Sequence, residues 1–107
     1  MYPDFDIIGK ADLLVIFARR IALSHKQMKQ LKSYIASGRP VIGIRTANHA
    51  FTAREKIAEG FEDWPEFVSS VLGCENRGYG PVEPGTDVTV NTNAANHPIL
   101  KGLPPQW

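Results

Sequence analysis

The sequence predicts an α/β domain in which helices pack against a mainly parallel sheet. Three observations carry this prediction: an apolar run at Leu13–Phe17, a second apolar run at Val41–Ile44, and an amphipathic stretch at Ser24–Ser37 between them. Short continuous apolar runs are typical of strands buried on both faces of a parallel sheet. The intervening segment is long enough for a right-handed crossover, so both strands are expected to run in the same direction.

The stretch between the two apolar runs carries the signals of a complete helix. Ser24, followed by Gln27 three residues later, forms a capping box that predicts the start of the helix. Gly38 can adopt the left-handed conformation that ends helices, and Pro40 prevents continuation. Apolar residues recur at spacings of three and four, which predicts one buried face: Met28, Leu31 and Ile35.

The middle of the chain predicts one more helix. The polar residues of 52–62 indicate a surface loop with a helical turn at 54–59. Asp63 is expected to cap a helix that Gly73 ends, with Trp64 and Phe67 in the core.

The last part of the chain is rich in turn signals. Glycines and prolines predict an irregular connection at 74–85, and alternating valines predict a strand over 86–91. The segment 97–104 is expected to form a helical turn closed by Gly102.

Length and composition narrow the classes of function. The 107 residues are expected to form one domain, and the net charge of +1 gives no electrostatic case for binding nucleic acid or an anionic membrane. The lone Cys74 suits a reducing compartment, and no apolar run or leader indicates a membrane span or secretion, so a cytoplasmic location is expected. The chain begins and ends in mid-pattern, which indicates a partial domain whose exposed sheet edges favour a homo-oligomer.

Polar side chains follow both predicted strands. Arg19 and Arg20 follow the first, and Arg45, Thr46, Asn48 and His49 follow the second. Ligands of open α/β sheets bind at the carboxyl ends of parallel strands, so these residues are expected to share a pocket.

Each of these residues has a structural alternative. Arg45 could hold an anionic or polyhydroxylated ligand, or form an ion pair with Asp12 or Glu75. His49 could act as a general base or a metal ligand, or be a buried structural imidazole, and no partner at metal-ligand spacing lies nearby in the sequence.

Three further residues complete the predicted site. Thr46 and Asn48 could bind a ligand or cap the following helix. His97 could reach the strand ends or form part of a turn before Pro98.

Two stretches, Gly43–Phe51 and His97–Pro104, together with the order of strand, arginine pair and helix before them, resemble the ThuA-like (trehalose utilisation) family. That family belongs to the class I glutamine amidotransferase-like superfamily. The resemblance implies a flavodoxin-like three-layer α/β/α fold with a mainly parallel sheet. It also implies a small-molecule carbohydrate partner. No cofactor is expected, and no metal, because His49 has no partner at metal-ligand spacing nearby in the sequence.

The resemblance also bears on the chemistry. In the superfamily a nucleophilic cysteine occupies the position of Arg45, and a guanidinium cannot attack a carbonyl. Glutamine hydrolysis is therefore excluded by this interpretation. Two functions remain open. One is a domain that binds or processes sugars or keto-glycosides, as a hydrolase or isomerase with His49 and Arg45 as catalytic residues if it is an enzyme. The other is a non-catalytic scaffold or interaction domain.

Overall fold

A computed structural model describes residues 2–106 of the chain. The chain divides into two compact units, Met1–Arg77 and Gly78–Trp107. The hydrophobic core and the α-helices belong to the first unit, which is a small mixed α/β structure.

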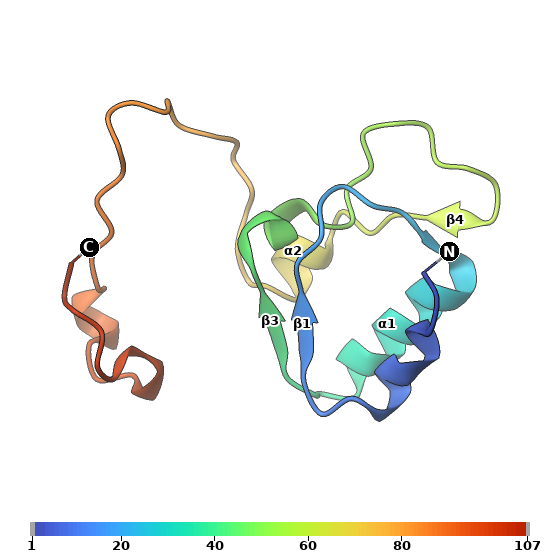
Figure 1. The fold of residues 1–107 in the computed structure, drawn as a ribbon, viewed down its shortest axis with the longest axis horizontal. Helices are drawn as coiled ribbons and strands as arrows, with labels where there is room; N and C mark the ends of the chain where they lie inside the picture. Colours follow the sequence, from blue (N-terminus) through green and yellow to red (C-terminus); the bar gives the residue numbers. More distant parts are fainter. Residues whose placement is uncertain (1, 107) are drawn as a thin grey trace. The chain divides into compact units, whose positions relative to one another are not determined.

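The first unit is organised around a short parallel sheet. Strand β1 (Leu14–Ile16) runs parallel to β3 (Val41–Gly43), with Leu14 opposite Val41, and Figure 1 shows the two as adjacent arrows pointing the same way. Helix α1 (His25–Ala36) lies between them in the chain. The predicted pair of parallel strands joined through a helix is confirmed.

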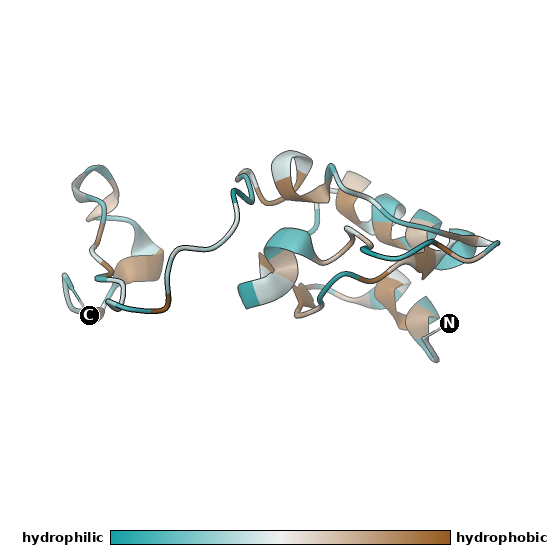
Figure 2. Ribbon diagram, turned by 90° about the horizontal axis from the view of Figure 1, so that it is seen from above, coloured by the Kyte–Doolittle hydropathy of each residue, from teal (hydrophilic) through white to brown (hydrophobic). Residues whose placement is uncertain are grey.

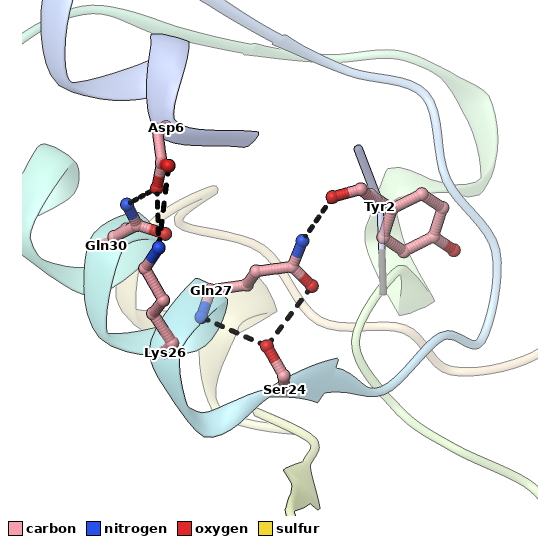
Figure 3. Close-up of polar contacts among 6 residues, drawn as sticks. All are labelled: Tyr2, Asp6, Ser24, Lys26, Gln27 and Gln30. Carbon is pink, nitrogen blue, oxygen red and sulfur yellow. Dashed lines mark hydrogen bonds and ion pairs between the residues drawn. The ribbon is translucent and has the colours of Figure 1, made fainter. Parts of the chain in front are cut away.

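The ends of α1 follow the sequence signals. The Ser24 hydroxyl accepts a hydrogen bond from the Gln27 backbone N–H at 3.3 Å and donates one to Gln27 Oε1 at 3.3 Å (Figure 3). At the other end, Gly38 has a φ of +73°, the left-handed conformation that glycine adopts without strain. The capping prediction is confirmed at both ends.

A 3-10 helix, η1 (Phe5–Lys10), is hydrogen-bonded to polar side chains of α1. The Asp6 carboxylate accepts hydrogen bonds from Gln30 Nε2 at 2.6 Å and from Lys26 Nζ at 3.4 Å (Figure 3). These bonds, together with the charge of Lys26, hold the pKa of Asp6 below its ordinary value.

Only one face of the β1–β3 sheet is buried in the first unit. Leu14, Ile16 and Val41 point into the core with residues of α1. The other face, called here the outer sheet face, is apolar and largely exposed; it consists of Leu13 (46% exposed), Val15 (50%), Phe17 (65%), Ile42 (49%) and Ile44 (42%). The prediction of strands buried on both faces is wrong because no element of the first unit covers this second face.

The segment after β3 forms a 3-10 helix, η2 (Arg45–His49), which leads into buried Ala50 and Phe51. Gly43 makes this tight turn possible. A Cβ atom at Gly43 would lie 3.0 Å from Ala47 Cβ and 3.1 Å from Leu72 Cδ2, closer than real Cβ atoms normally approach other atoms.

The loop predicted over 52–62 contains a strand instead of a helical turn. Strand β4 (Phe61–Glu62) pairs antiparallel with β2 (Leu23–Ser24), and 54–59 contains no helix. The helical turn predicted at 54–59 is wrong because this segment leads into β4, where Phe61 pairs with the residues that precede α1.

The second α-helix is much shorter than predicted. It is a single turn, α2 (Phe67–Ser70), and Asp63 does not cap it. Asp63 Oδ2 instead accepts a hydrogen bond from the Ala53 backbone N–H at 3.3 Å. The core prediction for Phe67 is confirmed: its ring is buried and packs edge-on against Phe51 at 5.0 Å and against half-buried Trp64 at 5.5 Å.

The second unit contains two 3-10 helices, η3 (Thr92–Ala94) and η4 (Pro98–Leu100), and few ladder hydrogen bonds. The strand predicted over 86–91 is wrong: an isolated bridge joins Thr89 to Gln106, because no adjoining residues continue the pairing. The predicted turn at 97–104 is confirmed, with Gly102 at a φ of +84°.

Hydrophilic and hydrophobic residues both occur along the helices in Figure 2, as expected for helices that bury one side. Within residues 2–106, no helix has the length and hydropathy that crossing a bilayer requires.

Candidate functional site

The two polar segments that follow β1 and β3 lie side by side, as the parallel topology predicts. The Arg20 backbone N–H donates to the His49 carbonyl oxygen at 3.1 Å, and the Ile21 N–H donates to the Ala50 oxygen at 2.7 Å. The Thr46 hydroxyl adds a third link, since it donates to the Ala18 carbonyl oxygen at 2.8 Å. These hydrogen bonds fix His49 beside the arginine pair.

A cavity of about 400 Å³ opens beside His49. It is called here the His49 cavity, and two walls define it. One wall comes from the strand-end segments and contains Arg20, Asn48, His49 and Thr52. The other comes from α2 and the residues on either side of it, and contains Pro65, Val68, Ser69, Cys74, Glu75, Asn76 and Arg77.

The His49 imidazole is buried and lies against an amide. Its Nδ1 is 3.2 Å from Asn76 Nδ2. An amide nitrogen can only donate, so in this arrangement Nδ1 accepts and the neutral ring carries its proton on Nε2. Burial lowers the pKa of His49, and the positive charges of Arg20, Arg19 and Arg54 lower it further. His49 is therefore a neutral imidazole near pH 7.

Two residues that line the His49 cavity each hold a side-chain atom that lacks a hydrogen-bond partner within the described residues. The two atoms are Arg20 Nε, a donor, and Asn48 Oδ1, an acceptor, and both are shielded from solvent. A buried polar atom without a partner costs about 1–3 kcal/mol. Arg20 also has a φ of +51°, which is unfavourable for a residue with a side chain. A ligand hydroxyl both donates and accepts, and would pair with this donor and this acceptor once the two side chains turn toward the cavity, because both atoms are shielded as they stand.

Three other predicted site residues of the first unit do not line the His49 cavity: Arg45, Thr46 and Arg19. Arg45 has a φ of +49° and an exposed side chain that does not line the His49 cavity, and no ion pair joins it to Asp12 or Glu75 within the described residues. Thr46 neither caps η2 nor lines the cavity, because its hydroxyl is bonded to Ala18. Arg19 lines a neighbouring cavity, which also contains Arg20.

His97 belongs to the second unit. Its Nδ1 accepts a hydrogen bond from the Ile99 backbone N–H at 3.3 Å, so the side chain caps η4. This is the turn role that the residue before Pro98 was expected to fill as the alternative to ligand binding.

Sequence reasoning missed the second wall of the cavity. Asn76 contacts His49, Glu75 and Arg77 form an ion pair at 2.8 Å, and exposed Cys74 precedes them. These residues follow a glycine in a stretch whose composition indicates only an irregular loop. The sequence signal that could have found them is the apolar helix face before Gly73, which anchors this loop beside His49.

The described residues include no group of three or more histidine, cysteine, aspartate or glutamate side chains able to hold a metal ion. Neither a model of a protein family, nor a curated protein, nor a solved structure matches this chain.

Proposed function

We propose that the chain is a carbohydrate-binding or carbohydrate-processing domain whose ligand occupies the His49 cavity. The observation that carries the proposal is that two residues lining one cavity, Arg20 and Asn48, each hold a buried side-chain atom without a hydrogen-bond partner among the described residues. Sugar hydroxyls supply both hydrogen-bonding roles that these atoms lack. The ThuA-like resemblance of the Gly43–Phe51 and His97–Pro104 stretches favours the same class of ligand.

A flavodoxin-like three-layer fold is part of this proposal. The parallel β1–β3 pair is consistent with it, and so is the outer sheet face, because sheets with two apolar faces belong to folds with helices on both sides. The same face supports the proposed homo-oligomer, since self-association would remove its side chains from water.

If the domain is an enzyme, its residues divide the work in a definite way. His49 lines the cavity and can exchange a proton with a substrate oxygen, and Arg20 can bind an oxyanion or adjacent hydroxyls. Removal of a proton by Nδ1 requires the Asn76 amide to turn away first, because that amide holds the acceptor position. Arg45 is proposed as a ligand contact from outside the cavity rather than as part of its wall.

The Asn48→Ala substitution tests the proposal. Because Asn48 Oδ1 is unpartnered, its removal should leave the urea midpoint unchanged or raise it, while hexose affinity falls about tenfold. Affinity is measured by NMR titration with a panel of hexoses, keto-sugars and glycosides. Asn96→Ala is the matched control, because Asn96 is exposed in the second unit and should leave both quantities unchanged.

Two further variants assign the residues. Arg20→Gln should weaken sugar binding more than Arg45→Gln, since only Arg20 lines the cavity; the reverse order would move the site to Arg45. Unchanged turnover of the sugar panel by His49→Gln would remove His49 from the mechanism. Failure of the wild-type chain to bind any sugar at millimolar concentration would favour a non-catalytic scaffold.

A further inference from the structure

A second cavity, of about 480 Å³, adjoins the loop after β1 and shares Arg20 with the His49 cavity. Its charged lining residues are called here the basic cleft: Arg19, Arg20, Arg54, Glu55 and Lys56. They come from two segments, the residues that follow β1 and the loop before β4. Within the first unit, these segments gather cationic side chains that are far apart in the sequence.

The basic cleft is more positively charged than the chain as a whole. Four cationic side chains against one carboxylate give the cleft a net formal charge of +3. The whole chain carries +1, so the remaining residues together carry −2. The positive charge of this nearly neutral chain is therefore concentrated at one place.

This charge is not balanced by ion pairs. Across the part of the chain that the structure describes, no salt bridge involves any of the five basic-cleft side chains. Four cations held close together with a single carboxylate among them repel one another, so the cleft favours an anion that would pair with them.

We propose that the basic cleft binds the phosphate group of a phosphorylated small molecule, and that the rest of this molecule lies in the adjoining His49 cavity. Guanidinium groups bind phosphate through two parallel charge-assisted hydrogen bonds, and a phosphate monoester carries close to two negative charges at pH 7. Arg20 lines both cavities and is the residue that would contact both parts of the ligand. The phosphate site depends only on the cleft, whereas a sugar as the remainder rests on the proposed function.

Binding of inorganic phosphate at constant ionic strength tests the cleft. An NMR titration of the full chain should shift the amide signals of 19–22 and 53–57. The double variant Arg54→Gln/Lys56→Gln should weaken binding at least about tenfold, because each lost charge removes a charge-assisted contact. Both side chains are exposed, so the urea midpoint should stay at its wild-type value.

The control for charge is Lys10→Gln, since Lys10 is exposed in η1 and lines neither cavity. It should bind phosphate as the wild type does. A second readout is the pKa of His49, which should rise when phosphate binds, because the anion offsets the charges of the nearby arginines. The double variant should lose this rise.

Three ligands separate this inference from the proposed function. A hexose 6-phosphate should bind more tightly than inorganic phosphate or the hexose alone, since it fills both cavities. Phosphate binding without hexose binding would support the anion site and refute the carbohydrate proposal. Hexose binding without phosphate binding would support the carbohydrate proposal and refute the anion site.

Three outcomes overturn the inference. The first is no phosphate binding up to about 10 mM, which is weaker than a specific site of this charge should be. The second is equal phosphate affinity in the wild type and the double variant. The third is an oligonucleotide that binds more tightly than the hexose phosphate, because the cleft would then be part of a nucleic-acid surface.

Discussion

Replacing Gly43 with alanine tests how the two walls of the His49 cavity are brought together. Gly43 ends β3, Ala47 lies in η2 before His49, and Leu72 lies just before the loop that carries Asn76. The missing Cβ atom at Gly43 lets these segments meet. A methyl group there would lie 3.0 Å from Ala47 Cβ and 3.1 and 3.3 Å from the two Leu72 methyl carbons.

The magnitude follows from two opposing effects. Overpacking of this kind costs about 1–3 kcal/mol of unfolding free energy. Replacing a glycine restricts the unfolded chain and raises the unfolding free energy by about 0.4–1 kcal/mol. Gly9→Ala is the matched control, because a Cβ at Gly9 meets nothing within 4 Å. The unfolded-state effect is common to both variants, so their difference in stability measures the crowding alone and should be about 1–3 kcal/mol.

Urea denaturation followed by tryptophan fluorescence gives both free energies. Sugar binding to Gly43→Ala should weaken as well, because any shift of Leu72 moves the loop that holds Asn76. Adding Leu72→Ala to Gly43→Ala should cost less than it costs in the wild type, since it removes two of the three crowded contacts. Equal stability of Gly43→Ala and Gly9→Ala would refute this account of the turn.

Two other predictions concern His49 and Ser24. The lowered pKa of folded His49 means that the unfolded chain binds a proton more readily, so stability should fall as the pH drops from above the ordinary histidine value of 6.5 toward the folded-state pKa. Urea midpoints measured at several pH values should show this slope in the wild type and a smaller one in His49→Gln; identical slopes would contradict it. Ser24→Ala should cost about 1 kcal/mol of stability by removing the cap of α1, whereas the exposed Ser33→Ala in the same helix should cost nothing. Thermal unfolding of both serine variants checks this, and similar losses in the two would rule out a specific capping effect.

The parts of the fold that the sequence predicted are those with local causes. Helix α1 combines a cap at Ser24, a periodic apolar face and a stop at Gly38, so each signal agrees with the others. The parallel pairing of β1 and β3 followed from that helix, because its length permits a crossover. Parallel pairing in turn predicts that Arg20 lies beside His49, and the hydrogen bond from the Arg20 N–H to the His49 carbonyl oxygen confirms it.

The errors arose where distant contacts decide the structure. Phe61 pairs with Ser24, which no local pattern around 52–62 reveals. Asp63 is a residue type that commonly caps helices, but its carboxylate accepts a hydrogen bond from the Ala53 N–H instead. Asn76 lies in a stretch without periodicity, and only the folded chain shows that it contacts the imidazole of His49.

The outer sheet face has a consequence for the association of this chain in solution. Five apolar side chains meet water on the β1–β3 strands, and attraction between such surfaces grows stronger on warming. In the proposed homo-oligomer, two molecules would meet through this face and remove the patch from water, and the associated fraction would rise with protein concentration. Binding titrations should therefore be run at low protein concentration and low temperature, where the monomer is favoured.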